Sequence, residues 1–165
     1  MKYKVIVGDL VEESCDVLIV WSFHDMKSGP EPFADVVRKA DSQAYYSFYA
    51  LKEHLKPSDA VTTIGGGTKA SRILFSIFPV NEEKFQDSFY NIRQTLDTYS
   101  KKNLCRFVSL SMPSYKKLDN LVMYMNTYLQ DMVSLKEVRI FCKSEEAKEL
   151  IKKSLQKVQT KKVPW

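Results

Sequence analysis

Hydrophobic residues follow two patterns along the chain, and each pattern predicts one kind of secondary structure. Short runs of β-branched and apolar residues predict strands. The expected strands are Tyr3–Val7, Val17–Val20, Phe107–Met112 and Val138–Cys142. Apolar residues at helical spacing predict helices. The expected helices run from Pro32 to Ala40, over Gln43–Leu55, Lys84–Lys101 and Leu118–Val133, and onward from an N-cap at Ser144.

The segment Ala60–Pro79 has the pattern strand, glycine, strand. Val61–Ile64 is β-branched throughout, Gly65–Gly67 follow, and Ile73–Phe78 is a nearly continuous apolar run. Such a run is typical of a strand covered on both faces. Because glycine accepts positive φ and close backbone approach, the three glycines either turn a corner or hold a ligand.

Strands and helices alternate along most of the chain, which predicts an α/β domain of three layers, an α/β/α sandwich around a mixed, largely parallel sheet. The 165 residues suit one domain, with a basic C-terminal helix and tail at about 144–165. Ligands of such sheets bind where loops leave the carboxyl ends of strands. The loops of interest are residues 8–13, 21–31, 65–71 and 113–118.

Composition narrows the class of protein. Hydrophobic residues make up 44% of the chain, enough for a packed core. Three widely spaced cysteines and only two histidines suit reduced thiols better than a disulfide framework or a metal site. No stretch has the length of a membrane span, and the N-terminus is too polar for a secretory signal. We therefore expect a cytoplasmic protein, or a nuclear one, with no metal and no cofactor.

The net charge of +5 is concentrated near the end, in residues 152–162. These lysines either attract anionic partners or form a solvated helix face. The aromatic and Met-rich stretches Tyr45–Tyr49 and Met123–Tyr128 are interpreted as core, with a partner groove as the alternative.

Four segments, in order, resemble the macro domain, the ADP-ribose-binding α/β module. Val7–Leu10 is similar to the family's Gly-Asp-Ile-Thr, and Cys15–Val20 to the strand before its Asn-Ala-Ala-Asn. Ala60–Pro79 looks like Ala-x-x-Thr-x-Gly-x-x-Leu followed by Ile-His-x-Val-Gly-Pro. Ser109–Pro113 resembles the strand before the second ligand loop, nearest to the branch that includes the terminal ADP-ribose protein glycohydrolases.

The resemblance implies a fold and a nucleotide ligand. In the family, the Asp of the first motif accepts from the adenine amino group, and Asp9 stands there. A carboxylate at a strand end suits that bond, although Asp also commonly caps such a turn. The resemblance further implies that Gly65–Gly67 make the turn between two strands, away from the phosphates.

The first ligand loop departs from the family pattern. Trp21–His24 replaces Asn-Ala-Ala-Asn, and His24 is the nearest counterpart of the second Asn, which orients the distal ribose. Ser28–Pro32 replaces Gly-Gly-Gly and keeps only Gly29. Proline has no N–H to offer a diphosphate, and Glu31 would repel it.

The second ligand loop departs as well. Pro113–Leu118 holds no glycine, so it cannot wrap a diphosphate with backbone amides. Lys116 and Lys117 either offer charge to a phosphate or stay solvated. The lysine and aspartate that carry the chemistry in the glycohydrolase branch have no counterpart, since Lys69 and Asp119 lie off the pattern.

Aromatic and titratable residues of the first loop have two interpretations each. His24 is a general base, or a structural or ligand contact. Trp21 and Phe23 stack on a ligand or pack in the core, with one expected to face each way. Cys15 precedes a buried strand without a His neighbour, so we do not expect a nucleophile.

The leading hypothesis is a macro-like domain with a divergent pocket that binds an ADP-ribose-type nucleotide or a relative, without catalysis. Asp9 would contact the adenine, loop 21–31 would flank the distal part, and Ser111–Lys117 would border the phosphates. The expected ligand-binding residues are Asp9, Leu10, Ser22, Phe23, His24, Gly29, Ser111, Pro113, Ser114, Tyr115 and Lys116.

Two alternatives come from other classes. In one, the pocket is lost and the basic surface binds nucleic acid, such as RNA, or a protein, such as an ADP-ribosylated one. In the other, the chain is an ADP-ribosyl hydrolase with atypical catalytic residues, for which His24 is the only candidate.

Overall fold

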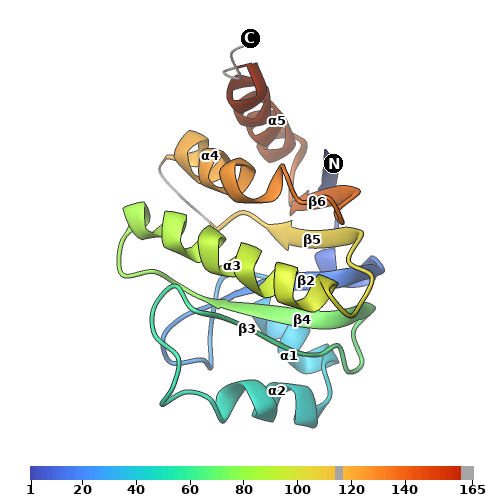
Figure 1. Cartoon of the computed structure of the whole chain (residues 1–165), viewed down its shortest axis with the longest axis vertical. Coiled ribbons are helices and arrows are strands. Elements are labelled where there is room, and N and C mark those ends of the chain that lie inside the picture. Colours follow the sequence, from blue (N-terminus) through green and yellow to red (C-terminus); the bar gives the residue numbers. More distant parts are fainter. Residues whose placement is uncertain (114–116, 161–165) are drawn as a thin grey trace.

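A six-stranded sheet forms the centre of the computed structural model, which describes residues 1–113 and 117–160 (Figure 1). The strands are β1 (Lys2–Val7), β2 (Cys15–Ser22), β3 (Ala60–Ile64), β4 (Ala70–Ile77), β5 (Phe107–Ser111) and β6 (Glu137–Cys142). Their order across the sheet is β1-β6-β5-β2-β4-β3. Neighbours pair in parallel except β3, which is antiparallel to β4. The predicted mixed, largely parallel sheet is confirmed.

Helices cover both faces of this sheet. They are α1 (Phe33–Lys39), α2 (Ser42–Tyr49), α3 (Phe85–Ser100), α4 (Leu118–Leu129) and α5 (Glu145–Thr160), with 3-10 turns η1 (Leu10–Glu12) and η2 (Glu82–Lys84). Buried side chains of α3, α4 and α5 form one core cluster with the sheet, and those of η1, α1 and α2 form another. Figure 1 shows α3 and α4 in front of the strands. The predicted three layers are confirmed, and no described helix is both long and apolar enough to cross a bilayer.

The apolar run of β2 lies between the two layers. Residues 17–21 are each at most 2% exposed, and alternate side chains enter opposite core clusters. A central parallel strand with helices on both faces requires this continuous apolar pattern. The pattern therefore places the carboxyl end of β2, and the loop after it, at the edge of a rigid core.

The glycine segment turns the corner between β3 and β4. Gly66 has φ +59°, and the Gly65 N–H donates to the carbonyl of Ser71 across the turn. An added Cβ at Gly65 would lie 1.8 Å from the Ala70 carbonyl oxygen, so no other residue fits there. The expectation that these glycines make the turn is confirmed.

Two helices end earlier than predicted. Helix α2 stops at Tyr49 rather than Leu55, and α4 stops at Leu129 rather than Val133. Residues 52–54 after α2 are exposed, and Val133 after α4 is fully exposed. The chain still packs on the core beyond both ends, through Leu55 after α2 and through Met132 and Leu135 after α4. Pro32 likewise stands at the N-cap of α1, one position before its first turn.

Trp21 and Phe23 lie on the same side of the sheet. Both rings contact Phe78 edge-on, with centroids 6.2 and 5.1 Å away. The expectation that they face opposite ways is wrong, because residues two apart in a strand share a face. Trp21 is fully buried, whereas Phe23 follows the last residue of β2 and is 39% exposed.

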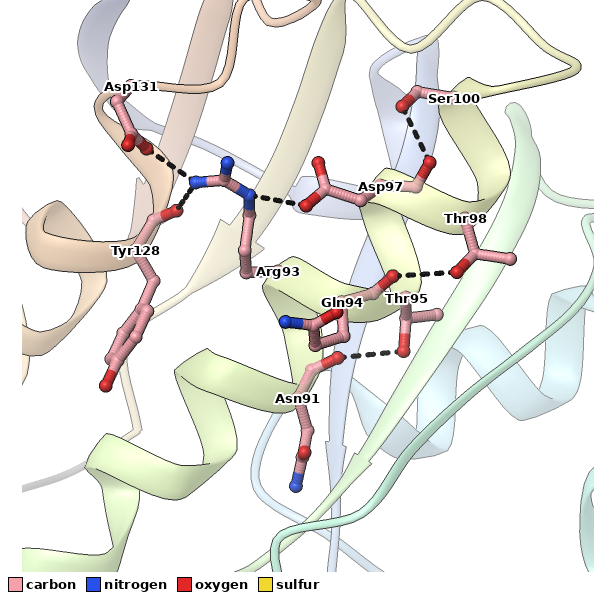
Figure 2. A network of polar contacts seen from close by, with 9 residues as sticks. All are labelled: Asn91, Arg93, Gln94, Thr95, Asp97, Thr98, Ser100, Tyr128 and Asp131. Atoms are coloured by element: carbon pink, nitrogen blue, oxygen red, sulfur yellow. Dashed lines mark hydrogen bonds and ion pairs between the residues drawn. The ribbon is translucent and has the colours of Figure 1, made fainter.

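A polar network joins α3 to the end of α4 (Figure 2). The Arg93 guanidinium donates to Asp97 at 2.8 Å, to Asp131 at 2.5 Å and to the Tyr128 carbonyl at 2.7 Å. The bonds to the two carboxylates raise the pKa of Arg93, and the bond to Asp97 contributes most. One side chain therefore ties together two helices of the same layer.

Replacing Arg93 with Met should lower the free energy of unfolding by about 1–3 kcal/mol, because a net charge-assisted hydrogen bond contributes about that much and both carboxylates are partly exposed. Urea unfolding measures the change. The matched control is Arg106→Met, since the Arg106 residue is exposed. An equal loss in both variants would contradict a specific role for the Arg93 network.

Gly29 has no room for a side chain, so Gly29→Ala should destabilise the protein. An added Cβ would lie 2.4 Å from the Trp21 carbonyl oxygen and 3.1 Å from the Phe33 ring. Overpacking of this kind costs about 1–3 kcal/mol. The control is Gly8→Ala, whose Cβ would meet nothing nearer than 3.8 Å and should be close to neutral. Thermal unfolding of both variants measures the difference in stability. Equal melting temperatures for Gly29→Ala and Gly8→Ala would refute the packing role of Gly29.

Candidate functional site

A cavity of about 530 Å³ opens at the carboxyl ends of β1, β6 and β5. These three strands are neighbours and run in parallel, so the loops that leave them meet at one edge of the sheet. The β2–α1 loop and one face of α5 complete the walls. The lining residues are Gly8, Leu10, Pro30, Glu31, Pro32, Ser111, Met112, Pro113, Leu118, Phe141, Cys142, Lys143, Ala147, Leu150 and Ile151.

Apolar side chains make most of the wall. Ala147, Leu150 and Ile151 follow the i, i+3, i+4 spacing, which puts them on one face of α5. Leu150 is 53% exposed, so its side chain is accessible to a ligand. Leu10 is held opposite by η1, and Phe141 is buried at the end of β6. Such walls suit the flat apolar faces of an aromatic ring.

Asp9 shapes this wall from just outside it. Its neighbours Gly8 and Leu10 line the cavity, whereas the half-buried Asp9 does not. Its Oδ1 accepts the N–H of Val11 at 3.1 Å and so caps η1. The cap is one of the two roles expected of Asp9, and it leaves Oδ2 without a hydrogen bond inside the described part of the chain.

Ser111 fixes the opposite wall. Its hydroxyl donates to the Glu31 carbonyl at 3.2 Å, and its own carbonyl accepts the Trp21 indole N–H at 2.8 Å. The first bond holds loop 30–32 against the end of β5. The second ties that strand end to a fully buried ring.

Two charged side chains stand among the described lining residues. Glu31 Oε2 and Lys143 Nζ lie 3.9 Å apart, and their side chains are 83% and 67% exposed. They come from the β2–α1 and β6–α5 loops. An exposed pair of this length is weak and opens easily.

Other expected site residues lie outside the cavity wall. Ser22 is fully buried and donates to the neighbouring Phe23 carbonyl, while Phe23 and His24 are exposed. Gly29 packs against the Trp21 carbonyl. Of the predicted residues, the structure brings together Leu10, Ser111 and Pro113. Ser114, Tyr115 and Lys116 lie outside the described residues.

Asp25 organises the loop that holds these exposed residues. Its carboxylate accepts from the Lys27 and Ser28 N–H groups at 2.9 and 3.0 Å and from the Ser28 hydroxyl. These bonds, the one from Lys27 foremost, lower the pKa of Asp25. The sequence signal was present, because Asp with Ser three residues later is a common turn pattern.

The residues that sequence reasoning missed come from β6 and α5. Phe141, Cys142 and Lys143 stand at or just after the end of a parallel strand. The carboxyl-end rule that selected the other loops applies equally to this one. Burial raises the pKa of the Cys142 thiol, so little of it is thiolate at neutral pH.

Lys69 and Asp119, which lie off the glycohydrolase pattern, make contacts away from the cavity. Lys69 Nζ donates to the Glu12 carbonyl at 3.0 Å, and Asp119 accepts from Ser154 and Lys157 of α5. Lys117 borders a separate polar pocket with Glu82 and Glu83. Among the described residues, no three His, Cys, Asp or Glu side chains gather as a metal site.

Comparison with known proteins gives one kind of match. No family model matches the chain, and no curated protein matches its sequence. A mutant macrodomain of Oceanobacillus iheyensis with ADPR is 13% identical to this chain and superposes with a TM-score of 0.80. The match covers 96% of this chain and 94% of the macrodomain.

Two further solved structures agree with this match. The Trypanosoma brucei macrodomain in complex with ADP is 14% identical and has a TM-score of 0.72. This match covers 93% of the present chain and 68% of the Trypanosoma chain. The macro domain of ganglioside induced differentiation associated protein 2 is 16% identical, with a TM-score of 0.70 and shares of 95% and 82%. The chain therefore has the macro-domain fold.

Proposed function

We propose that this chain is a divergent macro-like domain that binds an ADP-ribose-type nucleotide, or a related ligand, in the apolar cavity. The observation that carries the proposal is the cavity itself, about 530 Å³ at the carboxyl ends of three parallel strands. Its size falls within the range of small-molecule sites. Neighbours with this fold have been solved with ADPR and with ADP, which supports a nucleotide as the ligand.

The adenine end is the part that the walls fit best. Leu10 and Leu150 present apolar side chains to the cavity, with Phe141 at its buried end. A purine inserted there removes apolar surface from water on both of its faces. The Oδ2 of Asp9 would accept the exocyclic amino group, while Oδ1 keeps its cap on η1.

Binding without cleavage is the second part of the proposal. Hydrolysis needs a positioned base or nucleophile at the reacting bond. Among the described lining residues, the titratable groups are Glu31 and Lys143, which face one another, and Cys142, whose thiol has a raised pKa. His24, the one catalytic candidate from the sequence, is exposed and outside the wall.

A second candidate function has one observation in its favour. Tyr46 of α2 is 64% exposed, and the ammonium groups of Lys27 and Lys52 lie 5.7 and 4.8 Å from the centre of the nearby Tyr49 ring. Aromatic and cationic side chains together suit single-stranded nucleic acid. RNA binding that weakens steeply with salt, and that Tyr46→Ala reduces, would support this function.

Titration calorimetry with ADP-ribose tests the proposed site. We expect binding heat for the wild type and at least a tenfold loss in Ala147→Phe, because the new ring would occupy the cavity beside Leu150. The matched control is Ala50→Phe, at an exposed position after α2. No heat and no thermal shift from the wild type at saturating ligand would refute the proposal, and release of ADP-ribose from a modified protein would refute its non-catalytic part.

Asp9→Asn separates the cap from base recognition. Asn keeps an acceptor for the Val11 N–H, so the melting temperature should change little. Its amide offers a donor where the adenine amino group needs an acceptor, so adenosine affinity should fall about tenfold. Inosine carries a carbonyl oxygen in place of the amino group, so the Asp9 carboxylate should disfavour it and the Asn amide should bind it more tightly than the wild type does. A wild type that binds inosine as tightly as adenosine would contradict this role for Asp9.

A further inference from the structure

Prolines occupy three of the described positions in the cavity wall. Pro30, Pro32 and Pro113 have no backbone N–H, so these three lining positions cannot donate a backbone hydrogen bond to a phosphate. The N–H of Phe33 is already bonded to the Pro30 carbonyl at 3.0 Å. Of the lining residues 30–32, only Glu31 has an N–H to give to a phosphate.

Two of the N–H groups at the start of α5 are already bonded, and the first turn is acidic. The Ala147 N–H donates to the Ser144 hydroxyl at 3.1 Å, and the Lys148 N–H donates to the Ser144 carbonyl at 3.0 Å. Glu145 and Glu146 add negative charge to the first turn. These carboxylates complement the helix dipole and repel a phosphate brought to the same place.

The described cavity wall contains one acidic and one basic side chain, those of Glu31 and Lys143. Lys143 is within 3.9 Å of the Glu31 carboxylate, so it is not a free cation. A phosphate that approaches Lys143 must displace that carboxylate and then lie beside it. The exchange replaces one anion with another, and the phosphate gains little from it while losing its own hydration.

We infer that Glu31 and Lys143 form a charge gate that makes the site select the uncharged nucleoside end of its ligand. The preferred ligand class is a neutral purine nucleoside, and a diphosphate attached to it adds no affinity. The inference rests on the proposed function, since it concerns the same cavity. It assigns Glu31 and Lys143 as specificity-determining residues.

Calorimetry with adenosine and with ADP-ribose, on the same proteins, tests the gate. For the wild type we expect adenosine to bind at least as tightly as ADP-ribose. Glu31→Gln frees Lys143 and removes the repulsion, so the affinity ratio should shift toward ADP-ribose by about three- to tenfold. Lys143→Gln should shift it the other way, because Glu31 then repels the diphosphate alone. The control Glu53→Gln, at an exposed site outside the cavity wall, should leave the ratio unchanged.

The outcomes separate the two proposals. ADP-ribose binding tenfold more tightly than adenosine, or a ratio that Glu31→Gln does not move, overturns the gate and leaves the nucleotide site intact. No heat from either ligand, in the wild type and in Glu31→Gln, overturns the proposed function and the gate with it. Thermal melting of each variant without ligand shows that the folded protein was measured.

Discussion

The hydrogen bond from the Trp21 indole to the Ser111 carbonyl connects the core to the cavity. A buried N–H needs an acceptor, and this one finds it 2.8 Å away at the end of the neighbouring strand. The Ser111 hydroxyl then holds the Glu31 carbonyl, so the position of loop 30–32 depends on how the indole packs. Because Trp21 also contacts Phe85 and Phe89 of α3, a helix remote from the cavity helps to place its wall.

The prolines of loop 30–32 restrict the backbone beside the cavity and supply no backbone N–H donors. Pro30 and Pro32 fix the backbone where the family has flexible glycines, and Glu31 between them points its carboxylate at Lys143. In the proposed nucleotide complex, apolar contact with Leu10, Phe141 and α5 would replace backbone contact with phosphate. Recognition of this kind depends on fit and desolvation more than on charge.

Local pattern and resemblance together predicted the fold because each element has a local cause. The apolar run of β2 and the glycine turn after β3 need little knowledge of the rest of the chain. The end of α2 was predicted wrongly, since Leu55 still packs against the core although the helix has already ended at Tyr49. Leu10 and Ser111 could be placed at the site because they lie just after and at the carboxyl end of a strand, respectively.

The rest of the site depended on strand order. Phe141, Lys143 and Leu150 reach the cavity because β6 lies between β1 and β5, and hydrophobic periodicity does not contain that order. Ser22 was expected from its place in a motif, but the residue is fully buried and its side chain has no access to the cavity. Sequence position therefore indicated which edge of the sheet to examine, and packing decided which side chains reach it.

The pairing of β1 with β6 has a consequence for how the cavity comes into existence. The first strand meets the last, so closing this contact costs more loop entropy than joining neighbours along the chain. Gly8 and Leu10 cannot face Leu150 and Ile151 until that long loop has closed. The cavity therefore exists only while both β1 and α5 are in place, and it is lost if the edge strand or α5 detaches. A ligand in it would bind only the fully assembled sheet, and occupancy would report on the folding of the whole chain.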